Sequence, residues 1–367
     1  MSKTPMYYSI YKQLQSEIQD GTYPVGTNLP TDKGLAERFG VSVITIKKAM
    51  ELLSTDGYIT RKPRKGTTVR EANPTKLNAM DTSHRIFGLV LTNFTDFFGA
   101  SILRSILSTA QSSTDFIVKM SYGDRELENQ AIHDLVALGI QGLILLPTSS
   151  EYASPELLNL VAKNFPVVVI DRLMGELPLS TIKTDSVAAS RAAVENLFAN
   201  GHTRIGMLTS DASASTIDDR ITGFITAHID AQQPFSRQQI VSTIDSVVPN
   251  SKRAITDDIA VLKTFFKQNP DLTAVVTSEY NIALLATSAL EALGKRVPED
   301  VSIISFDAPA MNPYEPHPVR FTHIEQNEAE IGKQAVLLLK KQITTPSFFK
   351  KVNLPFKLIN GNTVRQL

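Results

Sequence analysis

The chain has 367 residues, with 37 Lys and Arg balanced by 37 Asp and Glu, and no cysteine. With 42% apolar and 20% charged residues, its composition is that of a globular protein of two or three domains, which excludes collagen-like and wholly disordered chains. Without cysteine there are no disulfides, thiolate nucleophiles or cysteine metal sites. No leader-like segment and no apolar run of membrane-spanning length is found. We therefore expect a cytoplasmic protein without membrane contact.

Charge is unevenly distributed along the chain. Residues 1–72 hold eleven Lys and Arg against seven Asp and Glu, a net charge of +4, so the remainder is slightly acidic. This asymmetry predicts a short N-terminal module that meets a polyanion and a larger body with another task.

The N-terminal module shows the pattern of three helices. Apolar residues at spacings of three and four predict a first helix, from about Tyr7 to Ile18, that Asp20-Gly21 ends. Thr31 and Ser42 are candidate N-caps of two further short helices separated only by Gly40-Val41. Two short helices so close together predict a helix-turn-helix.

A basic hairpin is expected next. The runs 58–62 and 67–70 have strand-like composition, and between them lie Pro63, Arg64, Lys65 and Gly66. Such a wing beside a helix that starts with hydroxyl and lysine side chains suits contacts to DNA grooves and phosphates. The alternative, solvated surface charge, stays open for any single lysine.

Three segments of this module resemble the winged-helix domain of the gluconate-repressor (GntR) family: 30–36 (PTDKGLA), 41–49 (VSVITIKKA) and 53–69. The resemblance implies a DNA-binding domain over residues 1–70. Where many members have Arg after Val-Ser, this chain has Val43, so the guanine contact of an arginine is not available there. By position, the resemblance implies DNA contacts by Lys33, Ser42, Val43, Thr45, Lys47, Arg64, Lys65 and Gly66.

The rest of the chain has an alternating strand and helix pattern. Residues 71–84 are polar and aperiodic, as in a linker, and we place a second domain at 85–367. Apolar strands alternate with helices from Ile86 to Phe306, with two of the helices expected at 191–199 and 220–230. This pattern predicts an α/β fold of two doubly wound, parallel-sheet lobes.

Ligands bind beyond the carboxyl ends of the strands in such sheets. The polar and aromatic residues that follow the predicted strands are therefore the candidates for a ligand site. Carboxylates, arginines and aromatic rings in one cleft suit a polyhydroxylated ligand such as a sugar, although an ordinary ion pair and core aromatics are the alternative for each residue alone. The candidates are Asp96, Phe98, Tyr122, Asp171, Arg172, Glu279, Tyr280 and Asp307.

Residues 86–345 resemble the effector domain of the lac-repressor (LacI/GalR) family. The resemblance rests on 165–172 (FPVVVIDR), 200–206 (NGHTRIG), Asp219-Arg220 with Gly223-Phe224, and 297–307 (VPEDVSIISFD). It implies the two-lobed fold of periplasmic binding proteins, with a sugar or nucleobase in the cleft. By position, it implies that Arg220 holds ligand hydroxyls and that Asp171 and Asp307 are cleft carboxylates, whereas Glu279-Tyr280 departs from the family's Asn-Asp.

Together these features predict a homodimeric transcriptional repressor that binds operator DNA and is released by a small sugar. The pairing of the two domains resembles that of known sugar-responsive repressors, and this resemblance implies L-arabinose or a related sugar. We expect no enzyme activity, no cofactor and no metal, since the minimal motifs of nucleotide, phosphate-loop, hydrolase and zincin sites are missing. Two alternatives remain: a ligand-dependent activator or corepressor-dependent repressor of the same architecture, and a sugar-processing enzyme.

Overall fold

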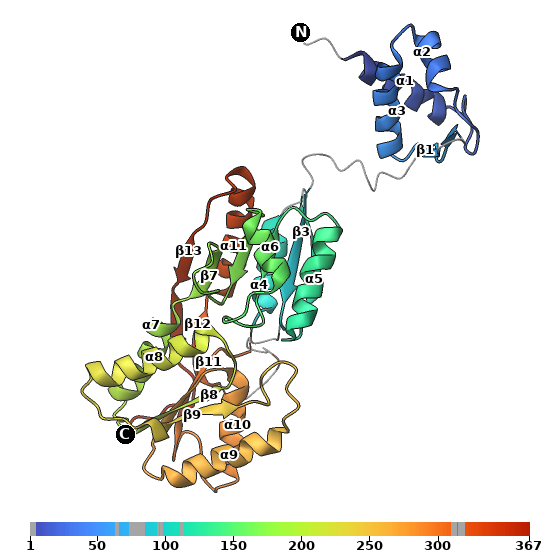
Figure 1. The fold of residues 1–367 in the computed structure, drawn as a ribbon. Coiled ribbons are helices and arrows are strands. Elements are labelled where there is room, and N and C mark those ends of the chain that lie inside the picture. Colours follow the sequence, from blue (N-terminus) through green and yellow to red (C-terminus); the bar gives the residue numbers. More distant parts are fainter. Residues whose placement is uncertain are drawn as a thin grey trace. The chain divides into compact units, whose positions relative to one another are not determined.

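The computed structural model describes residues 5–62, 66–72, 85–93, 95, 98–110, 114–309, 314 and 320–367. The chain divides into two compact units, Met1–His84 and Arg85–Leu367, each of which is described by itself. The α/β architecture with parallel sheets predicted from the sequence is confirmed (Figure 1).

The first unit is a winged helix-turn-helix. Its three helices pack on one apolar core, and Thr31 and Ser42 cap the second and third helices by accepting hydrogen bonds from the backbone of Gly34 and Thr45. Arg61 joins the wing to the start of the second helix through an ion pair with Asp32, at 2.5 Å. The elements are α1 (Met6–Gln19), α2 (Asp32–Phe39), α3 (Val43–Thr55), β1 (Ile59–Lys62) and β2 (Gly66–Val69).

The second unit has two lobes, each built around a six-stranded sheet (Figure 1). The sheet of the first lobe is parallel throughout, in the order β13-β7-β6-β5-β3-β4. Helices α4 and α11 cover one face and α5 and α6 the other. The elements are β3 (Arg85–Leu91), α4 (Ala100–Ala110), β4 (Thr114–Met120), α5 (Arg125–Ala137), β5 (Leu143–Leu145), α6 (Pro155–Ala162), β6 (Val167–Ile170), β7 (Ser180–Thr184), α11 (Glu328–Thr344) and β13 (Lys351–Leu354).

The second lobe has the strand order β14-β12-β11-β10-β8-β9, in which only the edge strand β14 is antiparallel among the described pairs. Helices α7 and α8 cover one face, and α9 and α10 the other. The elements are α7 (Ser186–Ala199), β8 (Ile205–Ser210), α8 (Ser215–Asp230), a 3-10 turn (Arg237–Gln239), β9 (Ile240–Ile244), α9 (Ile255–Gln268), β10 (Ala274–Thr277), α10 (Tyr280–Glu291), β11 (Ser302–Phe306), β12 (Thr322–Gln326) and β14 (Phe356–Ile359).

The chain passes between the lobes three times: after β7, between β12 and α11, and between β13 and β14. Two of these crossings are joined directly, because the backbone N–H of Asp185 donates to the carbonyl of Leu354 at 3.1 Å. Asp185 also caps α7 by accepting from the backbone of Ala188. Both lobes are thus made from segments far apart in sequence.

Two glycines allow helices to pack closely. A Cβ at Gly223 of α8 would overlap the carbonyl oxygen of Val187 in α7, and one at Gly332 of α11 would overlap the carbonyl oxygen of Ile102 in α4.

Two helices begin earlier than the sequence predicted. The helices expected at 191–199 and 220–230 each start five residues before the apolar pattern indicated, at Ser186 and Ser215. Their first turns, Ser-Val-Ala-Ala and Ser-Thr-Ile-Asp, carry small or mixed side chains without a clear apolar period, which concealed this extension.

Candidate functional site

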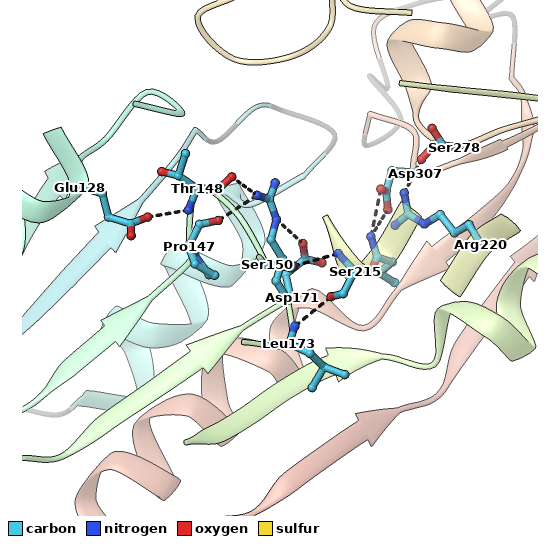
Figure 2. A network of polar contacts seen from close by, with 12 residues as sticks. Glu128, Pro147, Thr148, Ser150, Asp171, Leu173, Ser215, Arg220, Ser278 and Asp307 are labelled. Carbon is cyan, nitrogen blue, oxygen red and sulfur yellow. Dashed lines mark hydrogen bonds and ion pairs between the residues drawn. The ribbon is translucent and has the colours of Figure 1, made fainter. Parts of the chain in front are cut away.

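A cavity of about 160 Å³ lies between the two lobes of the second unit. A buried water occupies about 10–15 Å³ on this measure, so the cavity has room for about 11–16 water-sized groups, which is the scale of one sugar ring. Both lobes contribute to it (Figure 2). Its polar and charged lining residues are Thr92, Asn93, Thr95, Asp171, Arg172, Ser210, Thr216, Arg220, Ser278, Glu279, Asn281, Asp307 and Gln326.

Two carboxylates reach the cavity from the carboxyl ends of parallel strands. Asp171 follows β6 and Asp307 follows β11, and both have left-handed backbone conformations, with φ of 67° and 59°. Aspartate tolerates this region better than most residues, and it is sparsely populated, so the surrounding fold must hold both residues there. Both side chains lie directly after the carboxyl end of a parallel strand, where the sequence analysis expected the ligand site.

Arg220 is the central cation of the second lobe. It lies in α8, is 7% exposed, and stacks over the ring of Phe306 with its guanidinium carbon 4.0 Å from the ring centroid. One terminal nitrogen donates to the carbonyl of Ser278 (Figure 2). Its Nε has no hydrogen-bond partner within the described residues. The side chain is therefore fixed in position and keeps a donor for a further partner.

Two acids, the buried Asp307 and the half-buried Glu279, adjoin Arg220. Burial raises the pKa of Asp307 and that of Glu279, each to about 7, although the nearby Arg220 opposes the shift in both cases. Gln326 donates from Nε2 to both carboxylate oxygens of Asp307. Oε1 of Glu279 and Oε1 of Gln326 have no hydrogen-bond partner in the part of the chain that the structure describes. Near neutral pH the two acids are therefore partly protonated.

Arg172 lines the cavity on the side of the first lobe. It donates to the carbonyls of Pro147 and Thr148 at 2.9 and 2.7 Å, and its Nε lies 3.9 Å from Oδ2 of Asp171 (Figure 2). The loop that carries these carbonyls is held from behind, because the backbone N–H of Thr148 donates to buried Glu128 at 2.5 Å. Burial lowers the pKa of Arg172 and raises that of Glu128.

Hydrogen bonds join the lobes beside the cavity. Ser150 of the first lobe donates its backbone N–H to the carbonyl of Ser213 at 2.9 Å, and its Oγ accepts from the backbone of Ser215 at 2.8 Å. In return, Oγ of Ser215 accepts from the backbone N–H of Leu173 at 2.9 Å (Figure 2). We call these three bonds the serine latch. They hold the two lobes together at the cavity.

Six of the effector-site residues expected from the sequence line this cavity: Phe98, Asp171, Arg172, Arg220, Glu279 and Asp307. Two others do not line it. Tyr280 lies at the start of α10 and packs edge-on against Phe321, and Tyr122 is 59% exposed. Asp96 lies outside the described residues.

Sequence reasoning missed Gln326, Thr216, Ser210 and Asn281. The strand-end rule would have found Gln326, which ends β12, had that strand been recognised. Thr216 belongs to the first turn of α8, which lies before the helix expected at 220–230. The strand-end rule also covers Ser210, which ends β8, whereas no pattern pointed to Asn281.

The expected DNA-contacting residues of the first unit gather at two places. Ser42, Val43, Thr45 and Lys47 occupy the cap and first turns of α3, and the exposed Lys33 lies in the first turn of α2. Gly66 begins β2 with φ of 88° and pairs with Lys62. Arg64 and Lys65 at the wing tip lie outside the described residues.

Within the described ranges, no helix has the length and apolar composition of a membrane span. The same residues contain no group of three or more His, Asp or Glu side chains that could hold a metal ion.

The comparisons with known proteins agree with this two-part architecture. Residues 6–69 match the family of bacterial regulatory proteins called gntR, and residues 194–364 match a periplasmic binding protein-like domain. The chain therefore combines a gntR-family helix-turn-helix domain with a periplasmic binding protein-like domain, as its sequence predicted.

Relatives of both domains are found. An arabinose metabolism transcriptional repressor of Geobacillus stearothermophilus is 24% identical over 99% of this chain and 98% of its own length. The HTH-type transcriptional repressor PurR of Aliivibrio fischeri is 29% identical over 74% of this chain and 78% of its own. The crystal structure of the transcription regulator CcpA of Lactococcus lactis superposes with a TM-score of 0.66 at 19% identity, covering 77% of this chain and all of that one.

Proposed function

We propose that the protein is a sugar-responsive transcriptional repressor of the combined LacI and GntR type, acting in the cytoplasm, in which a small carbohydrate in the interlobe cavity controls binding of the winged helix to operator DNA. The observation that carries the proposal is the polar composition of the cavity. Among the described residues, Nε of Arg172 and Nε of Arg220 have no hydrogen-bond acceptor, and Oε1 of Glu279 and Oε1 of Gln326 have no hydrogen-bond donor. Hydroxyl groups serve both kinds of partner, because each can donate and accept.

Charge in the cavity favours a neutral ligand. Two arginines face Asp171 and two acids whose pKa values are raised to about 7, so the lining carries little net charge near neutral pH. A phosphorylated ligand would find no excess of positive charge here. The polar surface and the aromatic ring of Phe98 instead suit the hydroxyls and C–H face of an unmodified sugar.

L-Arabinose, or a pentose like it, is our first candidate for the effector. Its support is the arabinose metabolism repressor that aligns with this chain over nearly its full length. The cavity, with room for about one sugar ring, is consistent with a monosaccharide.

For the mechanism we propose a homodimer in which each winged helix contacts one operator half-site. Ligand binding changes how the lobes close on each other and thereby the separation of the two winged helices. A coupling of about 1–3 kcal/mol between the two sites would change operator affinity about 5- to 150-fold. The same closure could also strengthen DNA binding, which would make the protein an activator or a corepressor-dependent repressor.

The test has two stages. First, pentoses and hexoses are screened by thermal shift with the full-length protein, since a ligand at 100 times its dissociation constant stabilises the fold by about 2.7 kcal/mol. Second, the stabilising sugar is added to a gel shift with duplexes from the gene's own promoter region. Release of the duplex supports the repressor, and tighter binding supports the alternative sign. Stabilisation by no sugar, together with equal affinity for promoter and random duplexes, would refute the proposal.

A further inference from the structure

The outward surface at the start of α3 is apolar where polar side chains would be expected. Ile44 is 70% exposed, the highest value for a large apolar side chain in the described part of the first unit, and the adjacent Val43 is 39% exposed. Both are β-branched residues, which favour neither the helix nor an exposed position. Neither side chain belongs to the apolar core, to which α3 contributes Ile46, Ala49, Met50 and Leu53.

The hydroxyls of this helix start are already engaged in capping. Oγ of Ser42 accepts from the backbone N–H of Thr45 at 3.2 Å and lies 2.9 Å from the hydroxyl of Thr45. The exposed side chains between them are therefore the two aliphatic ones. The exposed Lys47 lies one turn further along, four residues after Val43, so the apolar pair adjoins a positive charge that can approach a phosphate.

DNA presents only one apolar group at the base edges of its major groove, the C5-methyl group of thymine. In helix-turn-helix proteins the first residues of the recognition helix contact those edges. We propose that Val43 and Ile44 recognise thymine methyl groups in the operator half-site, a specificity that rests on the proposed DNA-binding function. This chain would thus select A·T pairs where an arginine at position 43 would select G·C.

The experiment starts by selecting duplexes from a random library with the full-length protein. Each thymine of the selected half-site is then replaced singly by deoxyuridine, which removes only the methyl group, and affinities are measured by gel shift. We expect uracil at one or two positions to weaken binding about fourfold, the effect of exposing one methyl-sized group. The penalty should vanish in Val43→Ala or Ile44→Ala, because the contact is then already lost.

Two variants serve as controls. Val25→Ala removes another exposed valine, 55% exposed in the loop before α2, and should leave the uracil penalty unchanged. Val43→Arg should shift the selected base at its position towards guanine. The uracil penalty is measured first with the wild-type protein, so misfolding of a variant cannot produce it. Each alanine variant is compared only if it still binds the selected duplex better than a random one.

The possible failures are distinguishable. Selection that enriches no sequence defeats the proposed DNA-binding function and this inference with it. An enriched site at which no thymine is sensitive to uracil, or whose penalty persists in both alanine variants, overturns the thymine contact and leaves the repressor intact.

Discussion

Gln326 and Asp307 lie at the ends of neighbouring parallel strands, and the amide of the first donates to both carboxylate oxygens of the second, at 3.1 and 3.0 Å. The contact fixes the carboxylate of Asp307 in the cavity wall. It also leaves Oε1 of Gln326 unpaired among the described residues. A change in this pair should therefore alter both the stability of the second lobe and the binding of a ligand in the cavity, and both effects can be measured.

Arg220→Ala should abolish the response to the sugar while DNA binding persists. The variant removes the donor Nε from the cavity and the stacking on Phe306, and a hydrogen bond from a charged group contributes about 1.5–3 kcal/mol, equivalent to about a 10- to 150-fold loss of affinity. Calorimetric titration of the sugar and a gel shift measure the two properties. Arg204→Ala, which breaks a surface ion pair with Asp271, is the matched control and should respond normally. A normal response of Arg220→Ala would remove this residue from the ligand site.

Asp307→Asn should change how stability depends on pH. Burial raises the pKa of Asp307 from 3.8 to about 7, so the folded protein binds this proton more tightly than the unfolded chain does. Its contribution to stability is therefore lost as pH rises from about 4 to about 7. Arg220 and Gln326 oppose the shift, whereas Glu328 and Asp171 add to it. Without ligand, the melting temperature of Asp307→Asn relative to wild type should increase between pH 5 and pH 8.

The measurement is a set of thermal melts of wild type and variant across that pH range. Asp271→Asn, at an exposed ion pair, serves as the control whose difference from wild type should vary much less. A constant difference between Asp307→Asn and wild type would contradict the raised pKa.

Ser150→Ala should weaken sugar binding indirectly, by removing a hydrogen bond that holds the two lobes together. The variant removes the Oγ that accepts from the backbone of Ser215, one of the three bonds of the serine latch. A net loss of about 0.5–1.5 kcal/mol would lower the population of the closed form, and sugar affinity should fall about 2- to 10-fold. Titration calorimetry measures it, with Ser108→Ala, on the exposed side of α4, as the control. Unchanged affinity would show that the latch does not favour the ligand-binding form.

Gly223→Ala should destabilise the second unit strongly. The added Cβ would overlap the backbone of Val187, so α7 and α8 would have to separate, and we expect a loss of about 3 kcal/mol or more. Gly294→Ala is a useful comparison: its φ of 71° strains an alanine, yet nothing lies within 4 Å, so the loss should be only about 1 kcal/mol. Urea unfolding gives both values. A loss of only about 1 kcal/mol in Gly223→Ala would show that α7 and α8 adjust to the added Cβ at little cost.

The sequence predicted the elements with continuous apolar runs and the side chains directly after them. Asp171 and Asp307 follow strands that are buried throughout, such as Val167–Ile170, and these were visible as patterns. The edge strands β13 and β14 were not, because each has four residues that are largely exposed or half-buried. Gln326 was missed because strand β12, which it ends, was not recognised. Tyr280 was wrongly expected in the cavity, because a position after a strand does not show whether the side chain points into the cavity or into the core, where Tyr280 packs against Phe321.

The three passages of the chain between the lobes bear on how the molecule is synthesised. The first lobe is completed by α11 and β13, and the second by β14, all of them from residue 328 onwards. During translation both sheets therefore remain without an edge strand until residues 351–359 leave the ribosome. No single cut of the polypeptide would release an intact lobe, and a stop codon before residue 351 would remove an edge strand from both sheets together.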